Sequence, residues 1–285
     1  MMILEIFKAL LIGIVQGITE WLPVSSTGHM ILVERFCSFS EKYMSGDFYQ
    51  RMFLVVIQLG SIFAVLVLFF GKLNPFAPSK SAPEKKKTWS LWSKVIVGAI
   101  PAGVIGILLD DWLEAHLFTP SIVCYVIAAA LLIYGVGFIV IERMRRRGYL
   151  EPSVTDTDDL TYKKAFGIGL FQVLSIIPGT SRSGSTILGG MLLGVSRSVA
   201  AEFSFFMALP IMAGASGLRT LKFLADGNLG TPEEWLLLGV AFVCAFVVSF
   251  VTIRFLMDFV KRHSFEGFGW YRIILAVLVL GFMLL

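Results

Sequence analysis

Uncharged apolar runs alternate with short charged segments along this chain of 285 residues. A helix needs about 20 apolar residues to cross the hydrocarbon core of a bilayer, so runs approaching that length predict membrane-spanning helices. Some runs are short for a perpendicular crossing, and we expect their helices to include flanking residues. The pattern predicts an all-α polytopic membrane protein with six transmembrane helices. These lie at 52–71, 95–109, 117–141, 203–218 (extendable to about 224), 235–253 and 273–285.

Two further apolar stretches, 6–33 and 165–196, are broken by Gly, Pro, Ser and charged residues. Each is too long for one helix and too polar for two helices that face lipid. We predict that each forms a re-entrant helix pair, which enters the membrane, turns and leaves on the same side. Such irregular backbone is tolerated at this depth only where protein or a water-filled cavity surrounds it.

The two broken stretches resemble each other in the spacing of their polar residues. In the first, Gly13 precedes Gln16 by three positions and Gln16 precedes Ser25 by nine, and the second repeats both spacings from Gly169 to Ser181. Three spans follow each pair, and an odd number of spans inverts the second copy relative to the first. We therefore predict an inverted-topology repeat. It forms a single integral membrane domain, 1–285, with repeat 1 at about 1–141, a cytoplasmic loop at about 142–164 and repeat 2 at about 165–285.

Composition supports the membrane assignment and adds a prediction of sidedness. With 56% hydrophobic residues, 15% charged residues and a mean hydropathy of +0.81, the chain is too apolar for a soluble domain. The net charge of +4 is modest, and we expect no nucleic-acid partner. Lys and Arg gather in 72–94 and 142–164, which predicts that these loops are cytoplasmic, whereas the acidic loop 110–116 should lie outside. The first re-entrant pair then opens to the outside and the second to the inside, so their polar turns can meet midway.

The first polar motif, from Gln16 to His29, places a carboxylate (Glu20), the run Ser25-Ser26-Thr27 and an imidazole in an apolar stretch. An ionisable group inside a membrane segment is costly, which makes it a functional hypothesis by default. Two plainer interpretations stay open: an interfacial position for Glu20 and a buried, hydrogen-bonded imidazole for His29.

Pro23 and the hydroxyl run predict a helix break followed by a new helix. A Ser or Thr after the break favours an N-cap, and the N–H groups of such a terminus bind phosphate well. Ser26 and His29 are three positions apart and share a face of that helix. A hydroxyl beside an imidazole suits nucleophilic attack with acid–base assistance.

The second motif, from Pro178 to Thr186, centres on Arg182, the only charged residue between Lys164 and Arg197. A guanidinium holds oxyanions in two-point fashion, and nearby hydroxyls add donors. A loop arginine reaching the membrane surface is the alternative. Together the motifs predict a pocket for a phosphorylated group at membrane depth. Arg197 and Glu202, by contrast, predict a helix start at the membrane surface with a structural role.

These motifs resemble those of the undecaprenyl-diphosphate phosphatase family, of the bacitracin-resistance type. The stretches Gln16–His29 and Pro178–Gly184 resemble the family's two main motifs, and Val56–Ser61 and Glu202–Phe205 also fit. The resemblance spans nearly the whole chain. It implies hydrolysis of undecaprenyl diphosphate to the monophosphate and inorganic phosphate in the bacterial inner membrane, which recycles the lipid carrier for peptidoglycan synthesis. It also implies resistance to bacitracin and a polyprenyl diphosphate substrate, and we expect the site to open extracytoplasmically.

The resemblance also implies roles for individual residues. The catalytic set is Glu20, Ser26, His29 and Arg182. The substrate-binding set is Gln16, Ser25, Thr27, Gln58, Ser181, Ser183 and Thr186, although Gln58 in mid-span could equally bridge two helices.

A divalent cation, Mg²⁺ or Ca²⁺, is implied as well, with Glu20 as its ligand. Some family members have Glu where this chain has Gln16, and an amide is neutral and a weak metal ligand. Substrate oxygens and waters would then complete the coordination around Glu20.

Three mechanisms fit the same residues. In the first, Ser26 attacks the terminal phosphorus, His29 handles its proton, and Glu20 orients His29 or holds the metal. Direct attack by water with His29 as base is the second, and attack by His29 itself is the third. In each, Arg182 and the hydroxyls clamp the diphosphate.

A transporter or flippase of a phosphorylated polyprenyl lipid is the alternative function, because inverted repeats with broken helices are typical of secondary transporters. A carrier needs the arginine but not an activated nucleophile, so Ser26, His29 and Glu20 favour the enzyme. A purely structural protein would leave the buried charges as uncompensated costs.

Two pairs of glycines four positions apart, Gly13–Gly17 and Gly190–Gly194, allow helices to pack closely. A homodimer and packing within one chain would both use them, and both stay open.

Overall fold

The structure, a computed structural model, describes residues 2–117, 119 and 122–283, without the side chains at 110, 111, 114 and 283. Over these ranges the chain is helical and contains no strand of a sheet, with a single parallel bridge between Val154 and Val195. The helical elements in chain order are α1 (Met2–Thr19), α2 (Ser26–Phe36), α3 (Gly46–Phe48), a π-helical segment (Tyr49–Phe53), α4 (Leu54–Leu68), α5 (Phe70–Leu73), α6 (Ala82–Leu117), α7 (Val123–Arg146), α8 (Tyr162–Val173), a 3₁₀ turn (Leu174–Ile176), α9 (Arg182–Leu192), α10 (Arg197–Ala225), α11 (Pro232–Arg262) and α12 (Glu266–Met283).

Six stretches of the described helices are long and apolar enough to cross a membrane, which confirms an all-α polytopic membrane protein. They are Met2–Thr19, Gly46–Leu68, Ala82–Leu109, Val123–Arg146, Arg197–Ala225 and Pro232–Arg262. Five of them overlap predicted spans, and three of these five contain the whole predicted span. The sixth is α1, most of which falls in the stretch 6–33 predicted to be re-entrant. Only two of its 18 residues, Glu5 and Lys8, are charged, so this arm also has the composition of a span. The predicted span 273–285 lies in α12, which also carries Glu266 and Arg272, and its last two residues are outside the described ranges.

The prediction that 110–116 forms an acidic loop is wrong. This segment belongs to α6, which continues to Leu117, so His116 lies in the last turn of a helix. The predicted loops 72–94 and 142–164 likewise include the start of α6 and the end of α7. A membrane helix can continue beyond its apolar part because charged side chains reach water while the backbone stays hydrogen-bonded. A fall in hydropathy therefore does not mark the end of a helix.

Three short helices, α2, α8 and α9, have 11, 12 and 11 residues. At 1.5 Å per residue they extend about 17–18 Å, well short of the ~30 Å hydrocarbon core of a bilayer. All residues of α9 from Ser183 to Met191 are buried. The polar residues of this helix are therefore surrounded by protein, as polar chemistry at membrane depth requires.

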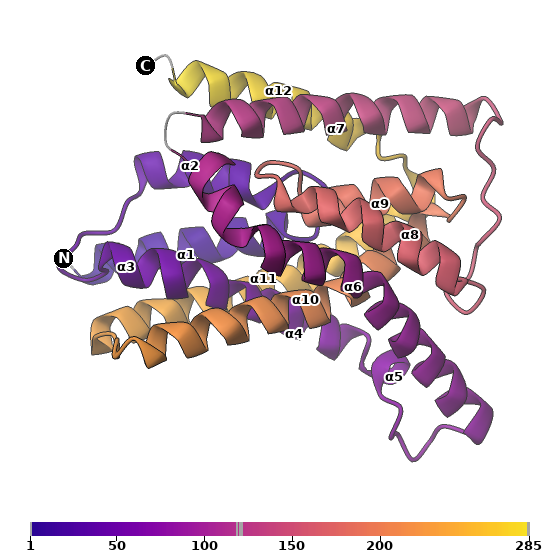
Figure 1. Ribbon diagram of the computed structural model, residues 1–285, viewed down its shortest axis with the longest axis horizontal. Coiled ribbons are helices and arrows are strands. Elements are labelled where there is room, and N and C mark those ends of the chain that lie inside the picture. Colours follow the sequence, from indigo (N-terminus) through magenta and orange to yellow (C-terminus); the bar gives the residue numbers. More distant parts are fainter. Residues whose placement is uncertain (1, 118, 120–121, 284–285) are drawn as a thin grey trace.

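Long-range helix pairs hold the short helices in place. α1 packs against α11, α6 against α8, α7 against α12, and α4 against α10 and α11. Figure 1 shows α7 and α12 side by side along one edge of the molecule, with α9 and α8 next to them. The polar segments between α1 and α2 and between α8 and α9 thus lie inside the bundle.

Glycines make the closest of these contacts. A Cβ at Gly13 would come within 2.7 Å of the carbonyl oxygen of Ala241 in α11, and one at Gly169 within 2.2 Å of that of Gly98 in α6. Gly17 likewise lies against Val248. The Gly13–Gly17 pair is therefore used within the chain, and a homodimer stays a prediction.

The two surface charges predicted to be structural pair with other elements. Arg197 is the first residue of α10, as predicted, and its guanidinium pairs with the buried Glu142 of α7. Glu202 accepts from Lys72 at 3.0 Å. These ion pairs tie the start of α10 to neighbouring elements.

Candidate active site

The two polar motifs begin two helices in the same way. Ser25 caps α2 by accepting from the backbone N–H of Gly28 at 3.3 Å, and Ser181 caps α9 by accepting from Gly184 at 3.2 Å. Both serines have positive φ angles, 75° and 68°, which residues other than glycine rarely adopt. The helix start predicted after Pro23 is therefore confirmed, and the first turns of α2 and α9 bring polar backbone into the bundle.

A buried ion pair joins the two motifs across 162 sequence positions. Nη2 of Arg182, at the start of α9, donates to Oε1 of Glu20, in the turn after α1, at 2.9 Å. The two side chains are 11% and 8% exposed. Ser183 adds a bond from its hydroxyl to the backbone oxygen of Glu20 at 3.0 Å. The predicted meeting of the two polar turns is therefore present in the structure.

The guanidinium of Arg182 is fixed on several sides. Its Nη1 donates to the carbonyl and hydroxyl oxygens of Ser204 in α10, at 2.8 and 3.2 Å. The Ser204 hydroxyl in turn shares a hydrogen bond with Thr186 at 2.7 Å. The guanidinium lies 5.4 Å from the centre of the Trp21 ring. Within the described chain the Nε of Arg182 has no partner, so one N–H of the oriented fork is unused.

Gln16 occupies the other side of the acid. Its Nε2 donates to Oε2 of Glu20 at 3.0 Å, so both carboxylate oxygens accept hydrogen bonds from the protein. No group of three or more His, Cys, Asp or Glu side chains that could hold a metal occurs in the described part of the chain. Each oxygen of Glu20 accepts one hydrogen bond and keeps a second lone pair, so Glu20 is the one predicted ligand at this centre that could hold a cation. The divalent cation stays a prediction.

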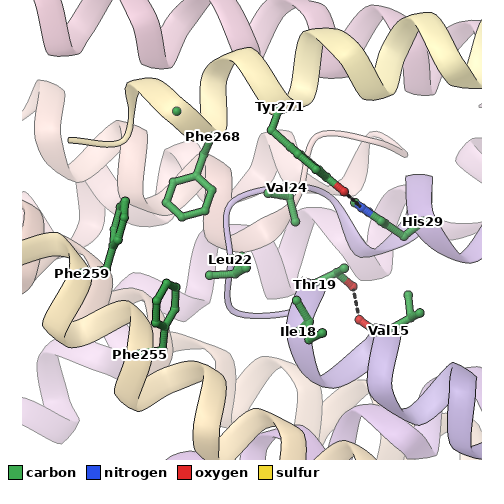
Figure 2. A pocket seen from close by; sticks show the side chains of 11 residues that line it. Val15, Ile18, Thr19, Leu22, Val24, His29, Phe255, Phe259, Phe268 and Tyr271 are labelled. Carbon is green, nitrogen blue, oxygen red and sulfur yellow. Dashed lines mark hydrogen bonds between the residues drawn. The ribbon is translucent and has the colours of Figure 1, made fainter. Parts of the chain in front are cut away.

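His29 of α2 lies against Tyr271 of α12 (Figure 2). Its Nδ1 is 2.7 Å from the carbonyl oxygen of Ser25 and its Nε2 is 2.6 Å from the Tyr271 hydroxyl. A carbonyl oxygen can only accept, so these contacts assign the proton to Nδ1 and leave Nε2 to accept from Tyr271. In the neutral form of this imidazole, Nε2 carries the lone pair that can take a proton.

An apolar cavity of about 490 Å³ ends at His29 and Tyr271. Figure 2 shows its wall formed by side chains from α1, the following turn, α11 and α12. The hydroxyl of Thr19 donates to the backbone oxygen of Val15 at 2.7 Å and adds no free polar group to the wall. The imidazole and the phenol are therefore the polar groups at one end of an apolar chamber. The lining residues are Val15, Ile18, Thr19, Leu22, Val24, His29, Phe255, Phe259, Gly267, Phe268 and Tyr271.

Four of the predicted site residues, His29, Ser26, Thr27 and Gln58, have no described contact with the ion pair. Ser26 is half-buried at the first position of α2, Thr27 is exposed, and Gln58 is half-buried on α4. Their roles stay predictions. Ser25 and Ser181 act as helix caps, and the Ser181 hydroxyl also lies 3.2 Å from that of Ser183.

Three residues at the site escaped the sequence analysis: Ser204, Tyr271 and Arg272. Ser204 lies in a long helix and carries no signal beyond its place in the stretch Glu202–Phe205. Arg272 was visible as a charge at the edge of the predicted span 273–285, and Tyr271 precedes it. Their contacts depend on where α12 packs, which spacing along the chain does not reveal.

Fold and site together define a polytopic membrane protein with a buried arginine–glutamate centre next to an apolar cavity. Residues 9–278 match the family described as "Bacitracin resistance protein BacA". This chain belongs to that family.

Relatives from several bacteria match along almost their whole length. The protein named "Undecaprenyl-diphosphatase" from Streptococcus thermophilus (strain ATCC BAA-250 / LMG 18311) is 54% identical, over 98% of this chain and 93% of its own. The protein of the same name from Enterococcus faecalis (strain ATCC 700802 / V583) is 50% identical, over 100% of this chain and 99% of its own. "Undecaprenyl-diphosphatase 1" of Clostridioides difficile (strain 630) is 55% identical, over 99% of this chain and 98% of its own.

The burial of the Glu20–Arg182 pair makes a prediction about stability. Removing one partner of a buried pair leaves an uncompensated charge and costs about 3–5 kcal/mol, whereas replacing both can be nearly neutral. We expect Glu20→Gln and Arg182→Met each to lower the thermal unfolding midpoint in detergent, and the double variant to fall by much less than the sum of the two. Lys261→Met, at the exposed pair with Asp258, should change the midpoint little. Additive effects of the two site variants would contradict the pairing.

Proposed function

We propose that this protein is an undecaprenyl-diphosphatase, which hydrolyses undecaprenyl diphosphate to undecaprenyl phosphate and inorganic phosphate. The observation that carries the proposal is the Arg182–Glu20 pair at the start of α9, because a buried guanidinium held in one orientation beside a helix N-terminus suits phosphate binding. The names of its relatives agree with this activity. Recycling of the lipid carrier for peptidoglycan synthesis, and resistance to bacitracin, follow from the activity.

The apolar cavity supports a lipid substrate. Its walls carry aromatic and aliphatic side chains, Phe255, Phe259 and Phe268 among them, and its polar end is at His29. A volume of about 490 Å³ accommodates only part of a long polyprenyl chain, so the rest of the chain would extend into the bilayer. The first isoprene units in the cavity would bring the diphosphate towards the starts of α2 and α9.

The diphosphate would bind through charge and backbone dipoles. Arg182 supplies a positive charge and an Nε that has no partner among the described residues, and the N-terminal turns of α2 and α9 supply partial positive charge and N–H groups. Ser183 and Thr186 are buried beside Arg182 and fix the first turn of α9. Phosphoryl transfer depends mainly on positioned positive charge of this kind.

The reaction requires a nucleophile and a proton acceptor. Ser26 attacks the terminal phosphorus, the bond to the bridging oxygen breaks, and undecaprenyl phosphate leaves. The hydrogen bond between Tyr271 and Nε2 of His29 first breaks, and Nε2 then accepts the proton of the Ser26 hydroxyl. Nδ1 keeps its hydrogen bond to the Ser25 carbonyl throughout. Water then hydrolyses the phosphoserine and releases inorganic phosphate. Direct attack by water with His29 as base uses the same groups, and trapping of the phosphoserine distinguishes the two routes.

Glu20 holds Arg182 in this scheme. The involvement of Mg²⁺ or Ca²⁺ rests on the resemblance alone. No step here depends on the metal.

For the architecture we propose one integral membrane domain built from an inverted repeat with two re-entrant helix pairs. Several observations support it: α2 and α9 have matching serine caps, Gly13 and Gly169 make matching close contacts, and α1 packs on α11 as α8 packs on α6. We place the protein in the bacterial inner membrane with the site open to the extracytoplasmic side.

The activity is tested by measuring phosphate release from a polyprenyl diphosphate with purified protein in detergent. We expect Ser26→Ala, His29→Ala and Arg182→Ala each to lower the rate by about 100-fold or more, as for other oriented catalytic groups. Surface variants of the same residue types, Ser93→Ala, His263→Ala and Arg143→Ala, serve as matched controls and should retain the rate. If EDTA lowers the rate and Mg²⁺ restores it, the metal prediction holds.

A well-folded sample that binds the lipid but releases no phosphate would contradict the phosphatase and favour the carrier. A rate unaffected by EDTA would contradict only the metal.

Sidedness is tested by cysteine labelling in cells, in a background lacking Cys37, Cys124 and Cys244. An impermeant thiol reagent should label Ala115→Cys, near the outer end of α6, and should label Lys86→Cys only after the cells are permeabilised. Both parent residues are exposed. Labelling of Lys86→Cys in intact cells would overturn the proposed orientation.

A further inference from the structure

Arg272 of α12 is a second buried arginine at the site. Its side chain is 0% exposed, yet it forms no ion pair with a carboxylate anywhere in the described ranges of the chain. Nε and Nη1 have no hydrogen-bond partner among the described residues. Arginine stays protonated in proteins. A buried positive charge without an opposite charge beside it is costly, which indicates a function.

The remaining nitrogen of Arg272 holds the turn that leads into α9. Nη2 donates to the backbone oxygens of Thr180 at 2.6 Å and Gly179 at 3.3 Å. Ser181 in this turn has a φ angle of 68°, which is costly for a residue other than glycine and which surrounding contacts must maintain. Arg272 therefore helps to fix the turn that carries Arg182.

The guanidinium also packs against the first turn of α9, at Gly184. A Cβ at Gly184 would come within 2.9 Å of Nη1 of Arg272, so a larger residue there would require the guanidinium to shift. On its other side the guanidinium is 5.4 Å from the centre of the Tyr134 ring. Its charge thus adds to that of the helix terminus at the place where the phosphate is proposed to bind.

The charges of the site do not balance without an anion. Glu20 compensates Arg182, while Arg272 is left with carbonyl oxygens and an aromatic ring as its only described partners. The three charged groups therefore sum to one positive charge. A phosphate group at the start of α9 would neutralise it.

We propose that Arg272 is a positioning residue for the phosphate of the substrate. It fixes the Gly179–Ser181 turn through two backbone oxygens and supplies the positive charge that the bound phosphate neutralises, acting from behind α9 without touching the substrate. The proposal rests on the proposed function and extends it to α12, a helix outside both polar motifs.

The test compares Arg272→Met, which removes the charge, with Arg272→Lys, which keeps it, in the full-length protein in detergent. Arg254→Met is the control, because Arg254 is an exposed arginine on α11 that lies over the Phe250 ring. Two quantities are measured for each: KM and kcat for a polyprenyl diphosphate, and the shift of the unfolding midpoint caused by pyrophosphate.

We expect Arg272→Met to raise KM about tenfold or more, the size of one charge-assisted interaction, with a smaller change in kcat. The pyrophosphate shift should be lost in this variant. Arg272→Lys should retain most of the shift and a KM near that of the wild type, and Arg254→Met should match the wild type in both. If the role of Arg272 were purely structural, both Arg272 variants would be less stable, and neither would show a rise in KM larger than its change in kcat.

A folded Arg272→Met with unchanged KM and an unchanged pyrophosphate shift would overturn the proposal. So would a folded Arg272→Lys that has lost the shift, an equal effect of Arg254→Met, or failure of both Arg272 variants to fold. The proposed function fails separately. If the wild type releases no phosphate but pyrophosphate still stabilises it in a manner that depends on Arg272, the anion site stands and the hydrolase does not.

Discussion

The ion pair between Glu20 and Arg182 is the contact on which the rest of the site depends. It joins a turn near the start of the chain to a helix in its second half, and both charges are buried. Neither charge is stable there alone, because an unpaired buried charge costs several kcal/mol. The pair therefore fixes how the two polar turns sit against each other. The helix caps, the Ser183 bond to the Glu20 backbone and the Ser204 contacts of Arg182 then complete a rigid centre.

The two motifs have similar backbone conformations but differ in their side-chain chemistry. Ser25 and Ser181 occupy the same capping position, and the next residue is Ser26 in one motif and Arg182 in the other. Gln16 bonds to Glu20 one helical turn later, whereas the residue four positions after Gln172 is Ile176. Gln172 is accordingly buried with no partner for its amide among the described residues. One copy thus supplies the acid and the proposed nucleophile, and the other supplies the cation.

The sequence was sufficient for the helical membrane class, the helix starts at both motifs and the meeting of Glu20 with Arg182, because hydropathy, N-cap residues and buried charge leave a local record. It was insufficient for the ends of α6, where charged residues continue a membrane helix to Leu117. The contributions of Ser204, Tyr271 and Arg272 were also missed, because they depend on how α10 and α12 pack. A tyrosine in an apolar helix gives no sign that its hydroxyl will meet His29 at 2.6 Å.

We expect the two polar turns to form one phosphate site at the end of the apolar cavity. A structure determined with a non-hydrolysable polyprenyl diphosphate analogue would show where the phosphate and the lipid chain bind. We expect the terminal phosphate within hydrogen-bonding distance of Arg182 at the start of α9, and the first isoprene units against Phe255, Phe259 and Phe268. Density for the phosphate at the basic residues 261–263, with the Glu20–Arg182 pair undisturbed and the cavity free of lipid, would contradict it.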